Sequence, residues 1–159
     1  ENIFNILNHS NKLNFKIKSA FVLDLYCGSG SFGIECISRG AKFVIFVENY
    51  NRVLPILKKN LSMLNSATNY SIIEKNIYNN FSLKEFNKKF DIIFLDPPYK
   101  ENNLEKILIK IKNLKLLNKK GIIIIHRHKN TKDIFPSNLK IVEEKVYGIS
   151  KITFLINLN

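Results

Sequence analysis

The segment that decides the fold is FVLDLYCGSGSFG, which runs from Phe21 to Gly33. Its first half is a mostly apolar run that ends at Cys27 and meets a glycine, which is typical of a buried parallel strand. Glycines then recur at the spacing G-x-G-x-x-G, and apolar residues continue to Ile37, shortly before Gly40. We therefore predict a strand, a glycine turn and a helix that ends at a C-terminal glycine.

The alternation of strands and helices continues towards the C-terminus. We predict further strands at 43–47, 70–74, 91–95 and 122–126, and helices at about 51–64, 83–89 and 104–114. Pro97 and Pro98 end the fourth strand, because proline cannot donate a hydrogen bond to a sheet. Gly121 opens the fifth strand. Strands that alternate with helices in this way predict a parallel α/β sheet.

The last part of the chain has a different pattern. Two strand-like runs, 139–147 and 151–158, are joined only by Gly148, Ile149 and Ser150. This connection is too short for a crossover, so it predicts an antiparallel hairpin. The predicted fold class is α/β, a Rossmann-like, doubly wound, mostly parallel seven-stranded sheet with a C-terminal antiparallel hairpin, in one domain over 1–159. This is the arrangement of methyltransferases rather than of dinucleotide-dependent dehydrogenases.

Composition limits the classes to which the chain can belong. The 45% hydrophobic content is that of a globular domain, and a formal charge of +12 favours a polyanionic partner such as nucleic acid. The chain is also rich in Ile, Lys and Asn, a bias typical of AT-rich genomes, which weakens the argument from charge. Its apolar runs are far shorter than the roughly 20 residues of a membrane span. We expect a cytoplasmic monomer that does not bind a membrane.

The chain does not begin with a basic segment, an apolar run and a cleavage site in succession, which is the pattern of a signal peptide. Because it opens on Glu1 rather than methionine, we expect a trimmed N-terminus and make no prediction about targeting. Cys27 and Cys36 flank the glycine turn without partners at the spacing of zinc ligands, and are expected to be reduced and structural.

The histidines also lack neighbours that would make them metal ligands, so we expect no metal site. His9 is isolated, whereas His126 and His128, with Arg127 between them, end the fifth predicted strand. There they lie beside the expected site, and a contact with phosphate or RNA is a hypothesis for them.

The glycine turn is the first candidate site. Its glycines let the backbone approach a ligand closely, and doubly wound sheets bind ligands at the carboxyl ends of their strands. The spacing alone fits NAD, FAD or S-adenosylmethionine. Asp24 favours S-adenosylmethionine, because a carboxylate before the turn repels a pyrophosphate but accepts from the ammonium of a methionine moiety, directly or through water. We predict that this cofactor is bound by Asp24, Tyr26, Gly28 and Gly30.

Three further residues complete the predicted cofactor site. Glu48 ends the second strand about 20 residues after the turn, where an acid can accept both ribose hydroxyls of an adenosine. Asn76 follows the third strand, where its amide can pair with the adenine edge while Ile77 covers the ring. In so asparagine-rich a chain, Asn76 also fits the description of an ordinary turn residue.

The most specific motif is Asp96-Pro97-Pro98-Tyr99, at the end of the fourth strand. The lone pair of an exocyclic amine is delocalised into its ring, so an enzyme that methylates it must orient the nitrogen. The Asp96 carboxylate and the Pro97 carbonyl can accept both amine hydrogens and direct the nitrogen at the methyl group. Two prolines keep these acceptors rigid, and Tyr99 can stack on a base taken out of its helix.

With these residues in place, the chain resembles the Class I methyltransferases of the bacterial small-subunit (16S) ribosomal RNA guanine-N2 type, often called the RsmD family. ENIFNIL, from Glu1, is similar to the N-terminal helix of that family. DLYCGSGSFGIECISRGA, from Asp24 to Ala41, is similar to its cofactor loop and following helix. The tetrapeptide matches its catalytic motif, and YGISKITFL, from Tyr147, resembles its final hairpin.

The resemblance implies methyl transfer from S-adenosylmethionine to the exocyclic amine of a guanine in 16S ribosomal RNA, with ribosomal RNA or the small subunit as partner. It implies that Asp24, Gly28, Gly30 and Glu48 bind the cofactor and that Asp96, Pro97 and Tyr99 hold the guanine. Two features depart from the family. Asn76 stands where aspartate is common, and the basic RNA-contacting segment that precedes the first helix is missing from this sequence.

Several alternatives stay open. The tetrapeptide recognises an amine on a planar group and not one particular ring, so DNA adenine and protein glutamine are other possible acceptors. A non-catalytic module that binds S-adenosylmethionine would keep the same fold. A nicotinamide-dependent dehydrogenase fits the glycine spacing alone.

Overall fold

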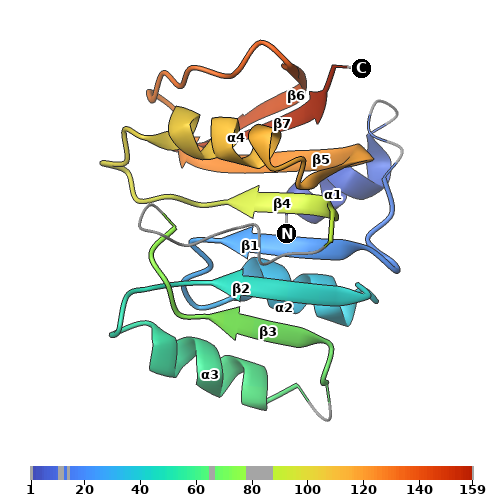
Figure 1. The fold of residues 1–159 in the computed structure, drawn as a ribbon, viewed down its shortest axis with the longest axis vertical. Helices are drawn as coiled ribbons and strands as arrows, with labels where there is room; N and C mark the ends of the chain where they lie inside the picture. Colours follow the sequence, from blue (N-terminus) through green and yellow to red (C-terminus); the bar gives the residue numbers. More distant parts are fainter. Residues whose placement is uncertain (1, 11–12, 14, 65–66, 78–87, 159) are drawn as a thin grey trace.

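The computed structural model describes residues 2–10, 13, 15–64, 67–77 and 88–158. These residues form one seven-stranded sheet in the order β3-β2-β1-β4-β5-β7-β6 (Figure 1). The strands are β1 Phe21–Leu25, β2 Phe43–Val47, β3 Tyr70–Ile73, β4 Phe90–Leu95, β5 Leu117–His128, β6 Leu139–Tyr147 and β7 Ser150–Asn157. The helices are α1 Asn2–His9, α2 Ser31–Ser38, α3 Leu54–Ser62 and α4 Leu104–Asn113.

The sheet has the predicted topology. Strands β1 to β5 pair in parallel, and β7 pairs antiparallel with both β5 and β6. The hairpin turns at Gly148 and Ile149, as the short connection required. The predicted mostly parallel, seven-stranded sheet with an antiparallel C-terminal hairpin is therefore confirmed.

The start of one strand and the described end of one predicted helix differ from the sequence prediction. Strand β5 begins at Leu117 and passes through Gly121, which was expected to open it. The early start has a packing reason, because Leu117 is buried and pairs with Phe90, with a register shift before Ile92. The short helix expected at 83–89 falls mostly outside the described residues, and the two that are described, Lys88 and Lys89, are not helical.

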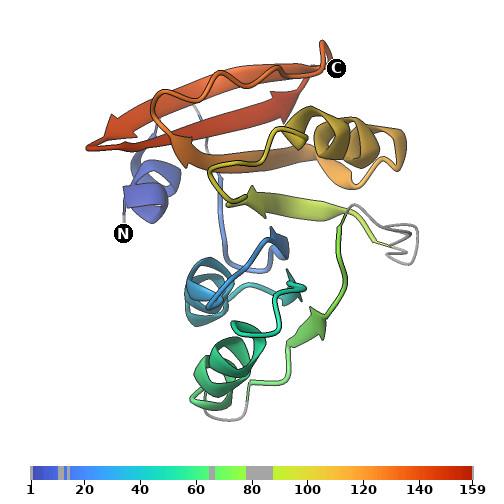
Figure 2. The ribbon, with the colours of Figure 1, turned by 90° about the vertical axis from the view of Figure 1, so that its left-hand side faces the viewer.

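Alternating side chains of the strands build a core on each face of the sheet. On one face, Val22 and Ile92 pack with α1, α2 and α3; on the other, Leu23 and Ile93 pack with α4. Figure 2 shows these helices on opposite sides of the sheet. No helix among the described residues is long and apolar enough to cross a membrane.

The strand order places a potential binding crevice in the middle of the sheet. From β1 the chain moves outward to β2 and β3, then returns to place β4 on the other side of β1. Ligands of open α/β sheets bind at such a reversal, outside the carboxyl ends of the strands. The glycine turn follows β1 and the tetrapeptide follows β4, so the topology brings the two strongest sequence motifs together.

Candidate active site

A cavity of about 640 Å³ lies at the carboxyl ends of the central strands. Seven of the predicted site residues line it, namely Tyr26, Gly28, Glu48, Asn76, Ile77, Asp96 and Pro98. Four other predicted residues, Asp24, Gly30, Pro97 and Tyr99, are not among its lining residues. The structure therefore brings residues that follow four strands, β1 to β4, to one cavity.

Gly28 and Gly30 in the turn are favoured for different physical reasons. Gly28 has a φ of +55°, and a Cβ atom there would meet no atom within 4 Å. The space beside Gly28 is thus open, as a close approach to a ligand requires. Gly30 has a φ of +83°, and its Cβ would lie 2.5 Å from Leu57 Cδ1 in α3. Gly30 is therefore required for the packing of α2 against α3 and not for the shape of the cavity.

Asp24 is completely buried beneath the turn. Its Oδ2 atom accepts a hydrogen bond of 3.0 Å from the backbone N–H of Gly33, whereas its buried Oδ1 atom has no hydrogen-bond partner among the described residues. Burial raises the pKa of Asp24 well above its usual value, and the negative charges of Asp96 and Glu48 add to this effect. An acceptor left unpaired in such a place is costly unless a donor such as a ligand or water satisfies it.

Glu48 holds the backbone around the end of β2. Its Oε2 atom accepts from the N–H of Gly28 at 2.9 Å, and its Oε1 atom accepts from Asn49 and Tyr50 at 2.9 Å each. A carboxylate offers about four acceptor positions, so roughly one is left for a ligand hydroxyl. To accept both ribose hydroxyls, as predicted, Glu48 would have to give up one of these backbone contacts.

Asp96 lies at the rim of the cavity, with its side chain 49% exposed. Its Oδ1 atom is 2.9 Å from Nδ1 of His126, at the end of the neighbouring strand β5. The hydrogen bond to Asp96 raises the pKa of His126 above its usual value, and partial burial opposes this effect. His126 was considered only as a possible phosphate contact from the sequence, and the structure pairs it with the catalytic candidate instead.

Arg127 holds the loop that contains the tetrapeptide. Its side chain is 3% exposed and forms an ion pair with the buried Asp133. It also donates to the carbonyl oxygens of Pro98 at 3.2 Å and Glu101 at 2.7 Å. The phosphate or RNA contact expected of His126 and His128 stays a prediction, whereas the guanidinium of Arg127 between them is buried and already paired.

The other two residues of the tetrapeptide lie outside the cavity. Pro97 is buried beneath the loop. Tyr99 is 64% exposed, and its ring meets the His128 ring edge-on with centroids 6.0 Å apart. An exposed aromatic ring beside the cavity has a face available for stacking.

Several lining residues were missed by sequence reasoning. They are Cys27, Ser29, Ser31, Asn49, Tyr50 and Glu101. Each is next to a predicted site residue or near it in sequence, but no spacing rule distinguishes these positions from ordinary loop residues. Both cysteines are free and buried, and burial raises the pKa of each thiol well above its usual value, as expected for structural cysteines.

The hydrogen-bond acceptors at and beneath this cavity fit S-adenosylmethionine. The unpaired Oδ1 atom of Asp24 can accept from an ammonium group through water, the space at Gly28 admits a ligand, and Glu48 retains acceptor capacity. Within the described residues, no group of three or more His, Cys, Asp or Glu side chains is arranged to hold a metal ion.

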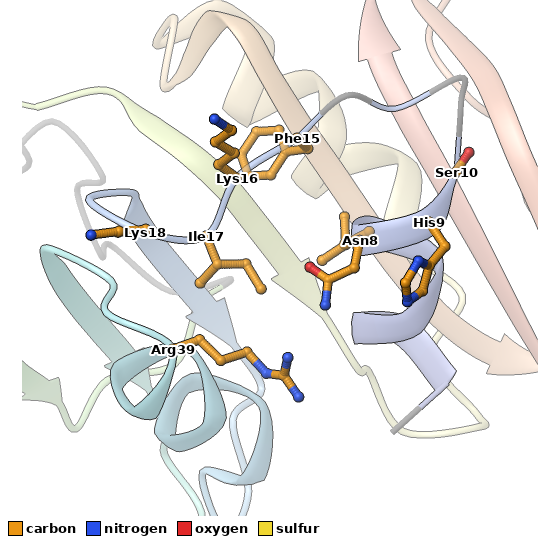
Figure 3. A pocket seen from close by; sticks show the side chains of 9 residues that line it. Asn8, His9, Ser10, Phe15, Lys16, Ile17, Lys18 and Arg39 are labelled. Atoms are coloured by element: carbon orange, nitrogen blue, oxygen red, sulfur yellow. The ribbon is translucent and has the colours of Figure 1, made fainter.

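A second cavity, of about 740 Å³, lies before the amino end of β1 (Figure 3). It is formed by the end of α1, the segment 15–18 and Arg39 after α2. Its lining is basic and apolar, namely Leu7, Asn8, His9, Ser10, Phe15, Lys16, Ile17, Lys18 and Arg39. It contains no residue of the glycine turn or the tetrapeptide, so we place the candidate active site at the carboxyl ends of the strands.

Comparisons with known proteins agree with this site. A family model described as conserved hypothetical protein 95 matches residues 1–156. The ribosomal RNA small subunit methyltransferase D of Buchnera aphidicola subsp. Baizongia pistaciae is 38% identical over 160 residues, covering 100% of this chain and 77% of that protein. Its namesake in Buchnera aphidicola subsp. Acyrthosiphon pisum is 37% identical over 130 residues, covering 82% of this chain and 67% of that protein.

A solved structure is similar over nearly the whole chain. The crystal structure of a putative methylase from Haemophilus influenzae is 30% identical, with a TM-score of 0.77, and covers 99% of this chain and 94% of that one. The likeness thus extends from the first helix to the final hairpin.

Proposed function

Because the chain belongs to the conserved hypothetical protein 95 family, we propose that it is an S-adenosylmethionine-dependent methyltransferase that acts on the exocyclic amine of a guanine in small-subunit ribosomal RNA. The sequence resemblance to small-subunit ribosomal RNA methyltransferases is confirmed by this membership and by relatives of that name. Those relatives support ribosomal RNA as the substrate. Guanine as the acceptor is our own step, taken from the resemblance of the tetrapeptide.

The observation that carries the proposal is the position of Asp96. Its carboxylate lies at the rim of the same cavity that Gly28 and Glu48 line from the neighbouring strands. A half-exposed carboxylate held by one histidine can accept a hydrogen bond from an amine that enters from solvent. A hydrogen-bond acceptor for an amine beside a nucleoside-sized cavity is what methyl transfer to a base requires, and this supports the proposal.

Residues of β1 and of the loops after β2 and β3 would bind the cofactor. Asp24 accepts from its ammonium group through water, Glu48 accepts from a ribose hydroxyl, and Ile77 covers the adenine from its buried position in the cavity wall. Once bound, S-adenosylmethionine supplies a methyl group on a positively charged sulfur, which is a good leaving group. The protein therefore needs to position the amine rather than to activate the methyl group.

The tetrapeptide would position the amine. Asp96 accepts one N–H, so that the nitrogen lone pair turns out of the ring plane towards the cavity. On methylation the nitrogen would lose one proton, which the Asp96 carboxylate would accept. Asp96 is half exposed, so this proton can pass from its carboxylate to water. Tyr99, on the outer side of the loop, offers its ring to the extruded base.

The test is transfer of labelled methyl groups to a panel of acceptors. Unmethylated small subunits, naked ribosomal RNA, duplex DNA and a protein extract are incubated with the protein and labelled S-adenosylmethionine. Label that maps to a guanine amine in subunits or ribosomal RNA supports the proposal, and the preferred form of the substrate gives its state of assembly. Label confined to DNA or protein would show that the proposed substrate is wrong but that the proposed methyl transfer is right. Cofactor binding without any transfer would favour a binding module.

A further inference from the structure

His126 is the one side chain among the described residues that is recorded within hydrogen-bonding distance of the Asp96 carboxylate. It ends the run of isoleucines in β5, and its side chain is 27% exposed. Its Nδ1 atom lies 2.9 Å from Asp96 Oδ1, a normal length for a hydrogen bond to a carboxylate. Without this contact, a carboxylate that is half exposed could rotate among several rotamers.

We propose that His126 is a positioning residue for methyl transfer, which donates Nδ1–H to Asp96 Oδ1, leaves Oδ2 for the target amine, and supports the reaction in its neutral form. This inference rests on the proposed function, because it assigns a role within the same reaction. It adds a residue from β5 to a motif that is otherwise contained within the loop after β4.

The neutral form is the productive one for an electrostatic reason. An imidazolium beside Asp96 withdraws charge from the carboxylate, so that Oδ2 becomes a weaker acceptor for the amine and for its proton. A neutral imidazole with its proton on Nδ1 still orients the carboxylate but leaves its charge available. The hydrogen bond raises the pKa of His126 above its ordinary value near 6.5, so this histidine changes its charge at a higher pH than an unpaired histidine does.

The strands beside β5 place apolar residues next to His126 on its face of the sheet, Ile152 in β7 and Phe94 in β4. One strand further away, Lys145 of β6 pairs with Ile152, and its charge is offset by an ion pair of 3.5 Å with Glu143. Arg127 and its partner in β7, Lys151, point to the other face of the sheet. His128 lies on the same face two residues further along, where its Nδ1 accepts from the N–H of Asn130. The charge of His126 should therefore depend mainly on Asp96.

The experiment measures kcat and KM from pH 5.5 to 8.5 for the wild type and two variants. The wild-type kcat should fall about tenfold per pH unit below the pKa of His126 and level off above it. His126→Asn keeps a side-chain N–H donor but does not titrate, so it should stay within a few fold of the wild-type plateau and lose this limb of the profile. His126→Phe should also lose this limb, with a kcat about tenfold below the wild-type plateau and an unchanged KM for S-adenosylmethionine.

The matched control is His9→Asn, which changes an exposed histidine in α1, on the other cavity. It should keep both the wild-type kcat and its pH profile. The inference is wrong if the kcat of His126→Asn still falls at low pH as that of the wild type does, or if His126→Phe keeps the wild-type kcat.

A second readout does not require activity. The pKa of His126, followed by NMR, should fall when Asp96→Asn removes the charge of its partner. An unshifted pKa would contradict the pairing, whatever the substrate is. A wild type that methylates no acceptor would contradict the proposed function and this role together, whereas an active wild type with an unchanged His126→Asn profile would contradict the role alone.

Discussion

The glycine turn and the tetrapeptide meet at the same cavity, but they are held in different ways. The carboxylates of Asp24 and Glu48 accept from backbone N–H groups of the turn and of the residues that follow Glu48. In contrast, the tetrapeptide loop is held by two side chains of β5, His126 on the Asp96 carboxylate and Arg127 on the Pro98 carbonyl. One half of the site is thus fixed by its own backbone, and the other by a neighbouring strand.

This difference predicts which substitutions affect which function. Changes in β5 should disturb the amine-binding half and leave cofactor binding intact. Changes at Asp24 or Glu48 should do the reverse. His126 and Arg127 are adjacent residues on opposite faces of one strand, so they contact the same loop from both sides of the sheet.

The largest effect is expected for Arg127→Met. The substitution leaves the buried carboxylate of Asp133 without its partner, which typically costs about 3 to 5 kcal/mol of unfolding free energy. Urea denaturation measures this loss. The double variant Arg127→Met/Asp133→Leu removes both charges and should recover much of the stability while the loop stays loosely held. A loss below about 1 kcal/mol in the single variant would mean that the Arg127–Asp133 ion pair and the hydrogen bonds of Arg127 to the loop contribute little to stability.

The next effect is that of Asp96→Ala on catalysis. Loss of the acceptor for the amine should reduce kcat by about 100- to 1,000-fold, the range seen when one group that stabilises a transition state is removed. The Kd for S-adenosylmethionine, measured by calorimetry, should change little, because Asp96 belongs to the other half of the site. A collapse of cofactor affinity in this variant would show that the two halves are not independent.

The same difference explains what the sequence could and could not predict. The glycine turn is contained in one segment, and its strand, spacing and acid at Glu48 are visible without a structure. The pairing of Asp96 with His126 joins residues 30 positions apart, and no local pattern reports it. The only signal was that polar residues end the isoleucine run of β5 at the same edge of the sheet as the tetrapeptide.

Burial was the second property that the sequence concealed. Asp24 was correctly singled out, but its position beneath the turn, with one oxygen on the Gly33 N–H, depends on how α2 packs over β1. From the sequence, Arg127 was noted only as the residue between His126 and His128, and arginine side chains are usually exposed. Its burial follows from the loop after β4 and from Asp133, which fold over the end of β5.

A smaller effect is expected for Glu48→Gln. An amide keeps one acceptor for the backbone but loses the charge that strengthens a hydrogen bond to a ribose hydroxyl, a contribution of about 1.5 to 3 kcal/mol. The Kd for S-adenosylmethionine should therefore rise by roughly 10- to 150-fold, with kcat at saturating cofactor nearly unchanged. Unchanged affinity would mean that Glu48 serves only to hold the backbone of Gly28, Asn49 and Tyr50.

The smallest effect is expected for Tyr99→Ala, because its ring is exposed and contributes to binding only when a base stacks on it. Stacking of one base on an aromatic side chain is worth about 1 to 3 kcal/mol, so KM for the RNA should rise while cofactor affinity and stability stay the same. Tyr99→Phe is the matched control, because it keeps the ring face and removes only the hydroxyl. If Tyr99→Phe raised KM for the RNA as much as Tyr99→Ala, the hydroxyl and not the ring face would make the contact. The outer side of the loop would then bind the RNA by hydrogen bonding instead of stacking.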